Sequence, residues 1–313
     1  MQAQAHRLPP IAVPLLLAVA VLGYLAGTRH PGRIASSQPP AAKLRVASGS
    51  GMVLEYPPGW QQQAGGSAIQ GLSLAHPLFL AGGGSAGLEA GFLGGTAPSP
   101  LPAGLISRLR GLPHVEVVGL AALQALHYTG VRLSGYSQQL ELYALPGSAG
   151  TETVLACHAP AAAGVEMAQC RQIAATLALA GQSIADITPD AGYASRLAVL
   201  LSALEGARSA ARARMAGARN PAEVAGPAEA LAGRFMLGAN TLARLEPPPV
   251  AGSAQVALAR SMIAAGGAYG QLAQAARRHM LKAYIGARSG VAAAERELNG
   301  ALENYALLGY GST

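Results

Sequence analysis

Two cysteines are the residues of this chain with the most definite chemistry. Cys157 and Cys170 are the only cysteines among the 313 residues, one at the end of an expected strand and the other inside the helix expected after it. A disulfide between them would join that helix to the sheet and stabilise the fold by about 3 kcal/mol, because it constrains the unfolded chain. We expect this disulfide. The alternatives are two free thiols, or a metal site that combines Cys157, His158 and Cys170 but lacks an evident fourth ligand.

A glycine-rich tract, GGGSAG at 82–87, matches two functional patterns at once. The Gly-x-Ser-x-Gly form around Ser85 is that of a nucleophile elbow, and the Gly-x-Gly-x-x-Gly form is that of a dinucleotide-binding loop. Both sites need a helix directly after the loop, whereas Leu88–Leu93 is typical of a strand. We therefore expect a flexible loop and no cofactor, with a secreted serine hydrolase that uses Ser85 as the alternative function.

The histidines of the first half of the chain form no recognisable catalytic set. His76, His114 and His127 could act as bases, but the acids of residues 46–181 are six glutamates and no aspartate, and none stands at a triad spacing. We expect solvated or structural roles for these histidines. The sequence thus predicts no catalytic residue and no metal site, and it favours a protein that is not an enzyme.

A stripe of arginines is expected on one helix of the C-terminal part. Arg208, Arg212 and Arg219 lie on overlapping faces of that helix, with Arg214 beside them. Such a stripe could contact an anionic lipid surface or a cell-wall polymer. The ordinary alternative is the polar face of an amphipathic helix. Binding of nucleic acid is not expected, because aromatic residues for base stacking make up only 4% of the chain.

An apolar segment near the N-terminus indicates the location of the protein. Ile11–Gly27 holds 17 residues without a charge, and as a helix it would be about 26 Å long, close to the thickness of a hydrocarbon core. It is either a cleavable export signal or an uncleaved anchor. Thr28 stands where a lipoprotein signal would need cysteine, so lipid attachment at this position is excluded.

The orientation of the chain has two competing indications. Basic residues between Arg29 and Arg45 follow the apolar segment, and under the positive-inside rule they favour a cytoplasmic C-terminal part. A short lead before an early apolar segment is the usual export arrangement, however, and a disulfide favours an oxidising exterior. We therefore expect an extracytoplasmic protein that is tethered through its N-terminal helix, or secreted if the segment is cleaved.

The composition excludes two further classes of protein. Charged residues make up 12% of the chain, with a net charge of +7, which is too sparse a charge for a highly charged disordered protein. Two cysteines are too few for a disulfide-rich miniprotein. The length allows two ordinary domains after a signal or anchor helix at 1–27 and a linker rich in proline at 28–42.

Residues 43–181 have the pattern of an α+β domain. Short alternating runs predict strands, and two stretches predict helices, Pro102–Leu109 and Val165–Leu177. Strands in meander order with two interspersed helices favour an antiparallel-sheet sandwich. The predicted strands are Leu44–Val46, Met52–Tyr56, Ala68–Ala75, Leu88–Leu93, Val115–Leu120, Leu123–Leu133, Gln138–Leu145 and Thr151–Cys157.

One short motif in this part of the chain resembles a known family. Met52–Trp60, with the sequence MVLEYPPGW, resembles the opening hairpin of the PsbP-like (Mog-type) α/β/α sandwich family. A late strand followed by a closing helix, Thr153–Leu179, is similar to the end of that fold. The resemblance covers residues 43–181 and implies a binding or assembly module rather than an enzyme.

From Thr188 onward the apolar period is helical. Two segments, TPD at 188–190 and NPAE at 220–223, are helix start signals, and Ser253 is expected to cap a third helix. Apolar residues then recur at steps of three and four from Leu258 to Tyr305, which permits one very long helix. We favour a turn near His279, and hence an alanine-rich four-helix bundle at 182–313, because a protruding helix could not bury its apolar stripe.

These patterns together favour a non-catalytic binding or scaffold protein of the cell envelope. The expected partner is an envelope protein or polymer, reached by a sandwich and a bundle that are held at the membrane or secreted. The sequence does not identify this partner, and it does not indicate an oligomeric state.

Overall fold

The computed structural model describes residues 43–94, 99–147 and 151–310. The expected export segment Ile11–Gly27 and the linker at 28–42 lie outside the described residues. Among the helices that the structure does describe, none combines the length and the hydropathy of a membrane span. Lys43–Thr313 forms one compact unit, which contains both the predicted sandwich and the predicted bundle.

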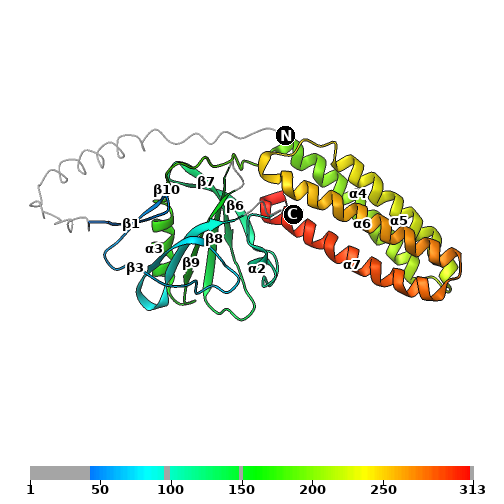
Figure 1. The fold of residues 1–313 in the computed structure, drawn as a ribbon, viewed down its shortest axis with the longest axis horizontal. Helices are drawn as coiled ribbons and strands as arrows, with labels where there is room; N and C mark the ends of the chain where they lie inside the picture. The colour runs from blue at the N-terminus through cyan, green and yellow to red at the C-terminus, as the bar shows by residue number, and fades with distance from the viewer. Residues whose placement is uncertain (1–42, 95–98, 148–150, 311–313) are drawn as a thin grey trace, which may run out of the picture. The chain divides into compact units, whose positions relative to one another are not determined.

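The first half of this unit is α+β, as the alternating sequence pattern predicts, with two antiparallel sheets and two helices (Figure 1). The seven-stranded sheet has the order β3-β4-β5-β9-β8-β7-β6, and a smaller sheet has the order β1-β2-β10. The strands are β1 (Arg45–Gly49), β2 (Met52–Tyr56), β3 (Gln61–Gln63), β4 (Ala75–Ala81), β5 (Gly87–Leu93), β6 (His114–Leu120), β7 (Leu123–Thr129), β8 (Gln139–Pro146), β9 (Glu152–Ala159) and β10 (Ala178–Leu179). The helices are α2 (Ala103–Ile106) and α3 (Gly164–Ala174).

The seven-stranded sheet buries both of its faces, because successive side chains of a strand point to opposite sides. On one face, Leu155 and Tyr143 belong to a core that α3 and the smaller sheet complete. On the other face, Tyr128 and Leu142 belong to a core that continues into the helical bundle. The hydroxyl of Tyr128 also donates a hydrogen bond to the carbonyl of Leu307, at 2.7 Å. The sheet and the bundle therefore share one apolar core.

The strand prediction is wrong at Ala68–Ala75, where the chain forms turns and irregular structure. The strand begins at Ala75 instead and passes through His76-Pro77. A register shift between Ala75 and Leu78 and a φ of 50° at His76 accommodate this dipeptide. Because β3 pairs only with residues 79–81 of β4, Pro77 lies where the strand has no neighbour on that side and needs no N–H.

The order of the strands also departs from a simple meander. β3-β4-β5 and β6-β7-β8-β9 are each meanders, but β9 pairs with β5 along its whole length. The chain between β5 and β6 therefore crosses to the far edge of the sheet and contributes α2 on its way. α2 is only four residues long, shorter than the predicted Pro102–Leu109.

The predicted disulfide is present between Cys157 in β9 and Cys170 in α3, with a Cα–Cα distance of 5.8 Å. Both cysteines are fully buried. The bond fastens the one long helix of the sandwich to a central strand of the sheet.

Loss of this disulfide is expected to destabilise the protein. A Cys157→Ala/Cys170→Ala variant should have a free energy of unfolding lower by about 3 kcal/mol, because a short loop of the unfolded chain is released. Denaturant unfolding of the oxidised protein, of the reduced protein and of the variant would measure this. Equal midpoints for all three would contradict a stabilising role for the bond.

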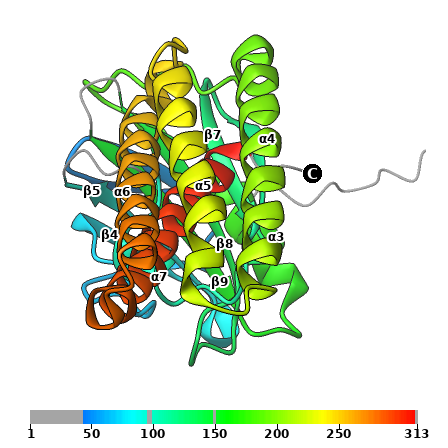
Figure 2. The ribbon, with the colours of Figure 1, turned by 90° about the vertical axis from the view of Figure 1, so that its right-hand side faces the viewer.

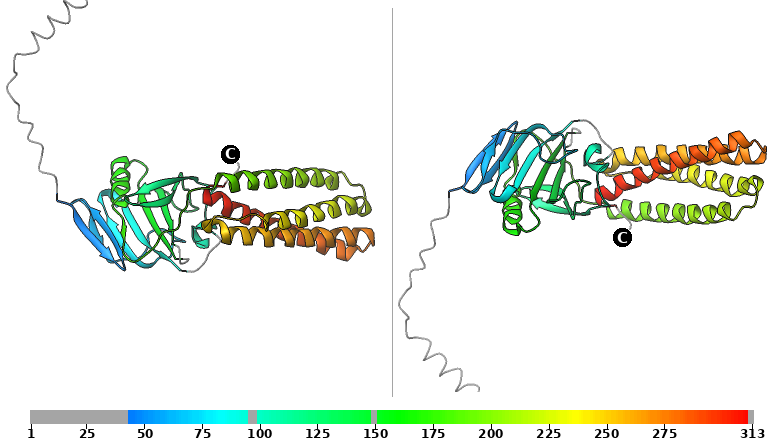
Figure 3. Two further views of the ribbon diagram at one scale, coloured as in Figure 1. Left: turned by 90° about the horizontal axis from the view of Figure 1, so that it is seen from above. Right: turned by 90° about the horizontal axis from the view of Figure 1, so that it is seen from below.

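The second half of the unit is a bundle of four helices, α4 (Ala191–Ala216), α5 (Pro221–Leu242), α6 (Gly252–Arg277) and α7 (Leu281–Tyr305) (Figure 3). A short 3₁₀ turn, η2 (Pro249–Ala251), precedes α6, and a π-helical turn, η3 (Ala306–Tyr310), follows α7. Viewed from its free end in Figure 2, the bundle has α4 on one side of α5 and α6 on the other. The predicted division near His279 is confirmed: α6 ends at Arg277, and His279 has a φ of 53°.

The helix starts are as predicted at one site and displaced at two. Asn220 caps α5, with its side chain accepting a hydrogen bond from the Glu223 backbone N–H, and Pro221 is the first helical residue. The cap of α4 is Asp190, not Thr188, because the Asp190 carboxylate accepts from the backbone N–H of Tyr193. The predicted cap of α6 at Ser253 is wrong, since η2 leads directly into a helix that begins at Gly252.

Candidate binding site between α4 and α7

The interface between the first and last bundle helices differs from the other three. α4 packs on α5, α5 on α6 and α6 on α7, through apolar side chains of one continuous core. α4 and α7 instead meet through a line of side-chain hydrogen bonds and ion pairs, which we call the polar seam. It contains Tyr193, Arg208 and Arg212 of α4, and Glu295, Asn299 and Tyr305 of α7.

A buried carboxylate, Glu295, is the centre of the polar seam. Its side chain accepts hydrogen bonds from Arg208 Nη2 at 2.5 Å, from Arg212 Nη2 at 2.7 Å and from the Tyr269 hydroxyl at 2.8 Å. Arg208 also donates to Glu205 at 2.6 Å and to Asn299 at 3.0 Å. Arg208 is 5% exposed and Glu295 is 8% exposed, so this is an ion pair inside the bundle.

The titration of these groups follows from their contacts. Burial alone would raise the pKa of Glu295, but the hydrogen bonds from Arg208 and Tyr269 and the two arginine charges outweigh it and hold this pKa below its usual value. Burial, together with the bond to Glu295, raises the pKa of Tyr269 to about 12. At neutral pH the carboxylate is therefore ionised and the phenol keeps its proton.

A tyrosine pair closes the seam at the end near the sheet. The hydroxyls of Tyr193 and Tyr305 are 2.6 Å apart, and Tyr193 donates to Gln255 Oε1 at 2.8 Å. The Gln255 amide in turn donates to the carbonyls of Leu242 and Leu245, which ties the seam to the end of α5. Every polar group of this closure thus has a partner.

Between the tyrosine pair and the ion pair, a groove of about 1150 Å³ opens between α4 and α7. The side of the groove that α4 supplies consists mainly of small residues. These are Ala194, Ser195, Ala198, Ser202, Gly206 and Ser209. Leu201 and Leu302 supply apolar surface, and Leu112 joins the lining from the sandwich. Small side chains allow another backbone to approach α4 closely.

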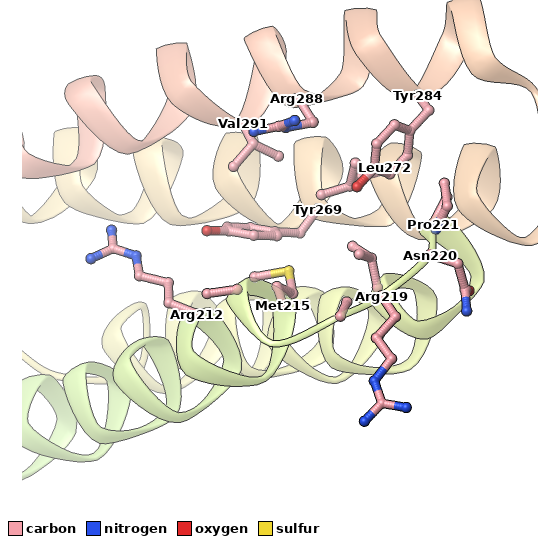
Figure 4. Close-up of a pocket in the computed structure, with 13 residues that line it drawn as sticks. Arg212, Met215, Arg219, Asn220, Pro221, Tyr269, Leu272, Tyr284, Arg288 and Val291 are labelled. Atoms are coloured by element: carbon pink, nitrogen blue, oxygen red, sulfur yellow. The ribbon is translucent and has the colours of Figure 1, made fainter.

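On the other side of the ion pair, a second cavity of about 540 Å³ lies where α4 turns into α5 (Figure 4). Three arginines line it, Arg212, Arg219 and Arg288, and we call it the basic pocket. In Figure 4, Tyr269 lies across the cavity from Met215. The guanidinium of Arg219 extends away from the other labelled side chains.

The predicted arginine stripe is therefore divided between different environments. Arg208 does not lie on the surface, because its guanidinium is buried against Glu205 and Glu295. Arg212 is half exposed and shares Glu295 with it. The placement of Arg219 on the same helix is wrong, because α4 ends at Ala216 and Arg219 lies in the turn before α5, exposed at the rim of the basic pocket. A spacing argument along one helix could not have found Arg288, which comes from α7.

Glu295 was also missed at the sequence level. It stands beside Ala294 in the predicted apolar stripe of the last helix and reads there as an ordinary exposed acid. The signal in the sequence was that Tyr269 belongs to the predicted apolar stripe and that Glu295 stands directly beside it. The structure buries both side chains. Pairing them with the arginines of α4 requires the antiparallel packing of the bundle, which a single sequence does not specify.

The glycine-rich tract around Ser85 forms the connection between β4 and β5, with Gly83–Ser85 in a single 3₁₀ turn. The predicted strand after it is confirmed, since β5 begins at Gly87. Its first and last glycines serve close packing: a Cβ at Gly82 would lie 2.8 Å from the Trp60 ring, and a Cβ at Gly87 would overlap the His158 ring. Gly84 has a φ of 62° in the turn itself. Packing and turn geometry thus account for these three glycines.

Ser85 does share a small cavity of about 350 Å³ with Glu89 and His158. His158 Nδ1 is bonded to Gln138 Oε1 at 2.8 Å, so its Nε2 is the free nitrogen, and this atom is 3.9 Å from Glu89 Oε1. A triad needs the acid on one ring nitrogen and the serine on the other. Here Nδ1 is bonded to the neutral Gln138 side chain, and Nε2 is nearest to the acid Glu89. Burial lowers the pKa of His158 and raises that of Glu89, which is 2% exposed and bonded to Ser67.

The three candidate histidines of the sequence do not come together. His76 lies in the β4 irregularity and His114 at the start of the edge strand β6. His127 is buried and stacked on Tyr143, with ring centroids 4.4 Å apart. Its two nitrogens contact Glu116 at 3.2 Å and Glu141 at 3.1 Å, so the ring lies between carboxylates of the two neighbouring strands.

No group of three or more possible metal ligands occurs among the described residues, and the alternative metal site of Cys157, His158 and Cys170 is not formed, because the two sulfurs are joined in the disulfide. The polar seam with its two flanking cavities is therefore the strongest candidate site of the described chain. Comparison of the whole chain with protein-family models, with curated proteins and with solved structures gives no match.

Proposed function

We propose that the protein is a non-catalytic binding or scaffold protein of the cell envelope, tethered by its N-terminal segment or secreted, and that it holds a helical segment of a partner protein in the groove between α4 and α7. The apolar N-terminal stretch Ile11–Gly27 supports export, and the Cys157–Cys170 disulfide suits an oxidising compartment. The resemblance of residues 43–181 to PsbP-like sandwiches agrees with an assembly role.

The observation that carries this proposal is the groove itself. Its small residues recur every four positions from Ala194 to Gly206, so they form one face along α4. The lined stretch of α4, from Ala194 to Ser209, is about 22 Å long at 1.5 Å per residue, the length of a helix of about four turns. Nε of Arg208, another lining residue, is buried and has no hydrogen-bond partner among the described residues. The groove therefore offers close approach along one face of α4, and the buried Arg208 Nε beneath it has no partner among the described residues.

The surroundings of Ser85 support a non-catalytic role. A strand follows the serine, so no helix N-terminus stabilises an oxyanion there, and His158 has its free nitrogen beside Glu89. The serine hydrolase nevertheless makes a clear alternative. Fluorophosphonate labelling of the protein that disappears in a Ser85→Ala variant would establish it in place of the binding role.

Site-specific photo-crosslinking in cells tests the groove. A photoreactive amino acid at Ser202, in the groove, is expected to give a discrete protein adduct, whereas the same amino acid at Ala203, on the exposed side of α4, should not. A Gly206→Phe substitution should abolish the adduct, because a Cβ at Gly206 meets nothing within 4 Å and the ring would fill the groove without a clash.

Two results would contradict the proposal. One is an adduct that forms equally from Ser202 and Ala203. The other is an adduct from Ser202 that persists when Phe occupies position 206 in a protein with unchanged circular dichroism.

A further inference from the structure

The basic pocket carries positive charge that the fold does not use. The guanidinium of Arg219 and that of Arg288 have no hydrogen bond or ion pair among the described residues. Arg212 is paired with Glu295. Burial lowers the pKa of Arg212 and the Glu295 carboxylate raises it, with a net rise. Two arginines without an ionic partner among the described residues and one partly engaged arginine thus line a single cavity, although the guanidinium of Arg219 is directed away from it (Figure 4).

The acids near the pocket do not neutralise this charge. Glu223, at the start of α5, is bonded to the backbone N–H of Arg219 and to the Asn220 amide, so it serves the helix cap. Glu295 is bonded to Arg208, Arg212 and Tyr269. Neither carboxylate pairs with the guanidinium of Arg219 or Arg288. An anion that enters the cavity would therefore meet an uncompensated positive field.

The remaining lining of the pocket is apolar and aromatic. Met215, Val224, Leu272 and Val291 supply the apolar part, and Tyr269 and Tyr284 supply the aromatic part. A cavity of about 540 Å³ is larger than a bare oxyanion requires. The lining thus fits a ligand that joins an anionic group to an apolar body.

We propose that the basic pocket binds a phosphate group that is attached to an apolar body. Guanidinium groups bind phosphate through paired, charge-assisted hydrogen bonds, and several around one cavity favour an anion with more than two oxygen atoms. The phosphate of a membrane lipid and that of a soluble monoester share this chemistry. Arg219 and Arg288 are the residues that would select the anion. Figure 4 shows the Arg219 side chain directed away from the cavity, so binding requires it to adopt another rotamer.

This site goes beyond the groove and does not require it. The ion pair around Glu295 separates the two cavities: Arg208 lines the groove, while Arg212 and Tyr269 line the basic pocket. Substitutions of Arg219 and Arg288 leave the groove lining intact. The crosslinking yield from Ser202 therefore distinguishes a failure of this inference from a failure of the proposed function.

Titration calorimetry of the full-length chain tests the inference with two phosphate probes, phenyl phosphate and dihexanoyl phosphatidylglycerol. Phenol and dihexanoylglycerol are the matched uncharged probes, which carry the same apolar bodies without a phosphate. An Arg219→Gln/Arg288→Gln variant is expected to bind at least one phosphate probe with an affinity lower by a factor of about ten or more, since charge-assisted hydrogen bonds are lost. The control is Arg234→Gln/Arg260→Gln, which removes two exposed arginines that do not line the pocket.

Each outcome decides the matter. A loss with the pocket variant alone, together with binding that weakens as salt is added, supports the site. The probe that binds more tightly then shows whether the source is a lipid or a soluble monoester. Absence of binding by both phosphate probes, equal binding of the uncharged probes, or an equal loss in the control variant would each overturn the inference.

Discussion

A Glu295→Ala variant is expected to have a free energy of unfolding about 3–5 kcal/mol lower than the parent chain, because it leaves Arg208 buried without its main partner. Arg208 is 5% exposed, so water cannot replace the carboxylate, and Tyr269 loses its acceptor in the same step. Denaturant unfolding at neutral pH would measure the change. The destabilisation should shrink in acid, since the pKa of Glu295 lies below its usual value and its contribution is lost as the pH falls through that pKa.

Two further variants separate the buried charge from the loss of a side chain. Glu297→Ala removes an exposed acid from the same helix and should change the stability by less than about 0.5 kcal/mol. Arg208→Met/Glu295→Leu replaces both partners and should recover much of the lost stability, as buried ion pairs exchanged for apolar side chains commonly do. A double variant as unstable as Glu295→Ala would contradict the account of an uncompensated arginine.

A Glu152→Gln variant is expected to be more stable than the parent chain at alkaline pH and about equally stable at pH 4–5. Burial raises the pKa of Glu152 from 4.5 to about 8, and its Oε1 has no hydrogen-bond partner among the described residues. Between these two pKa values the unfolded chain loses a proton that the folded chain keeps, so the stability of the parent falls by about 1.4 kcal/mol per pH unit. Glutamine cannot ionise, and the expected difference above pH 8 is a few kcal/mol.

Unfolding free energies at several pH values between 4 and 9 would test this, with Glu303→Gln, an exposed acid, as the control. The control should follow the parent at every pH. Parallel pH profiles for the parent and Glu152→Gln would show that this carboxyl titrates normally in the folded protein.

Local sequence signals predicted those parts of the fold that a few neighbouring residues determine. The α5 cap at Asn220 and the turn near His279 depend on contacts within one or two turns of chain, and the strand after Ser85 was indicated by its own apolar run. The disulfide was predictable because the only two cysteines lie in adjacent elements. In each case the determining interactions are close in sequence, so composition and spacing were sufficient.

Features that depend on distant residues were not predictable in the same way. β9 pairs with β5 rather than closing a meander, because its two faces are buried by α3 on one side and by the bundle on the other. The strand at His76-Pro77 forms because β3 ends before reaching the proline. The seam around Glu295 needs side chains from three helices to meet. A sequence read alone contains these residues but not their proximity.

The bond between Tyr128 and Leu307 has a consequence for how the molecule can be assembled. These residues are 179 positions apart, and the turn that carries Leu307 covers the sheet face to which Tyr128 belongs. A polypeptide that emerges N-terminal end first, from a ribosome or a translocation channel, can pair its strands early but must leave part of that face exposed to water. This part is covered only when the turn after the last helix arrives, so nascent intermediates of this protein expose apolar side chains that a chaperone would recognise.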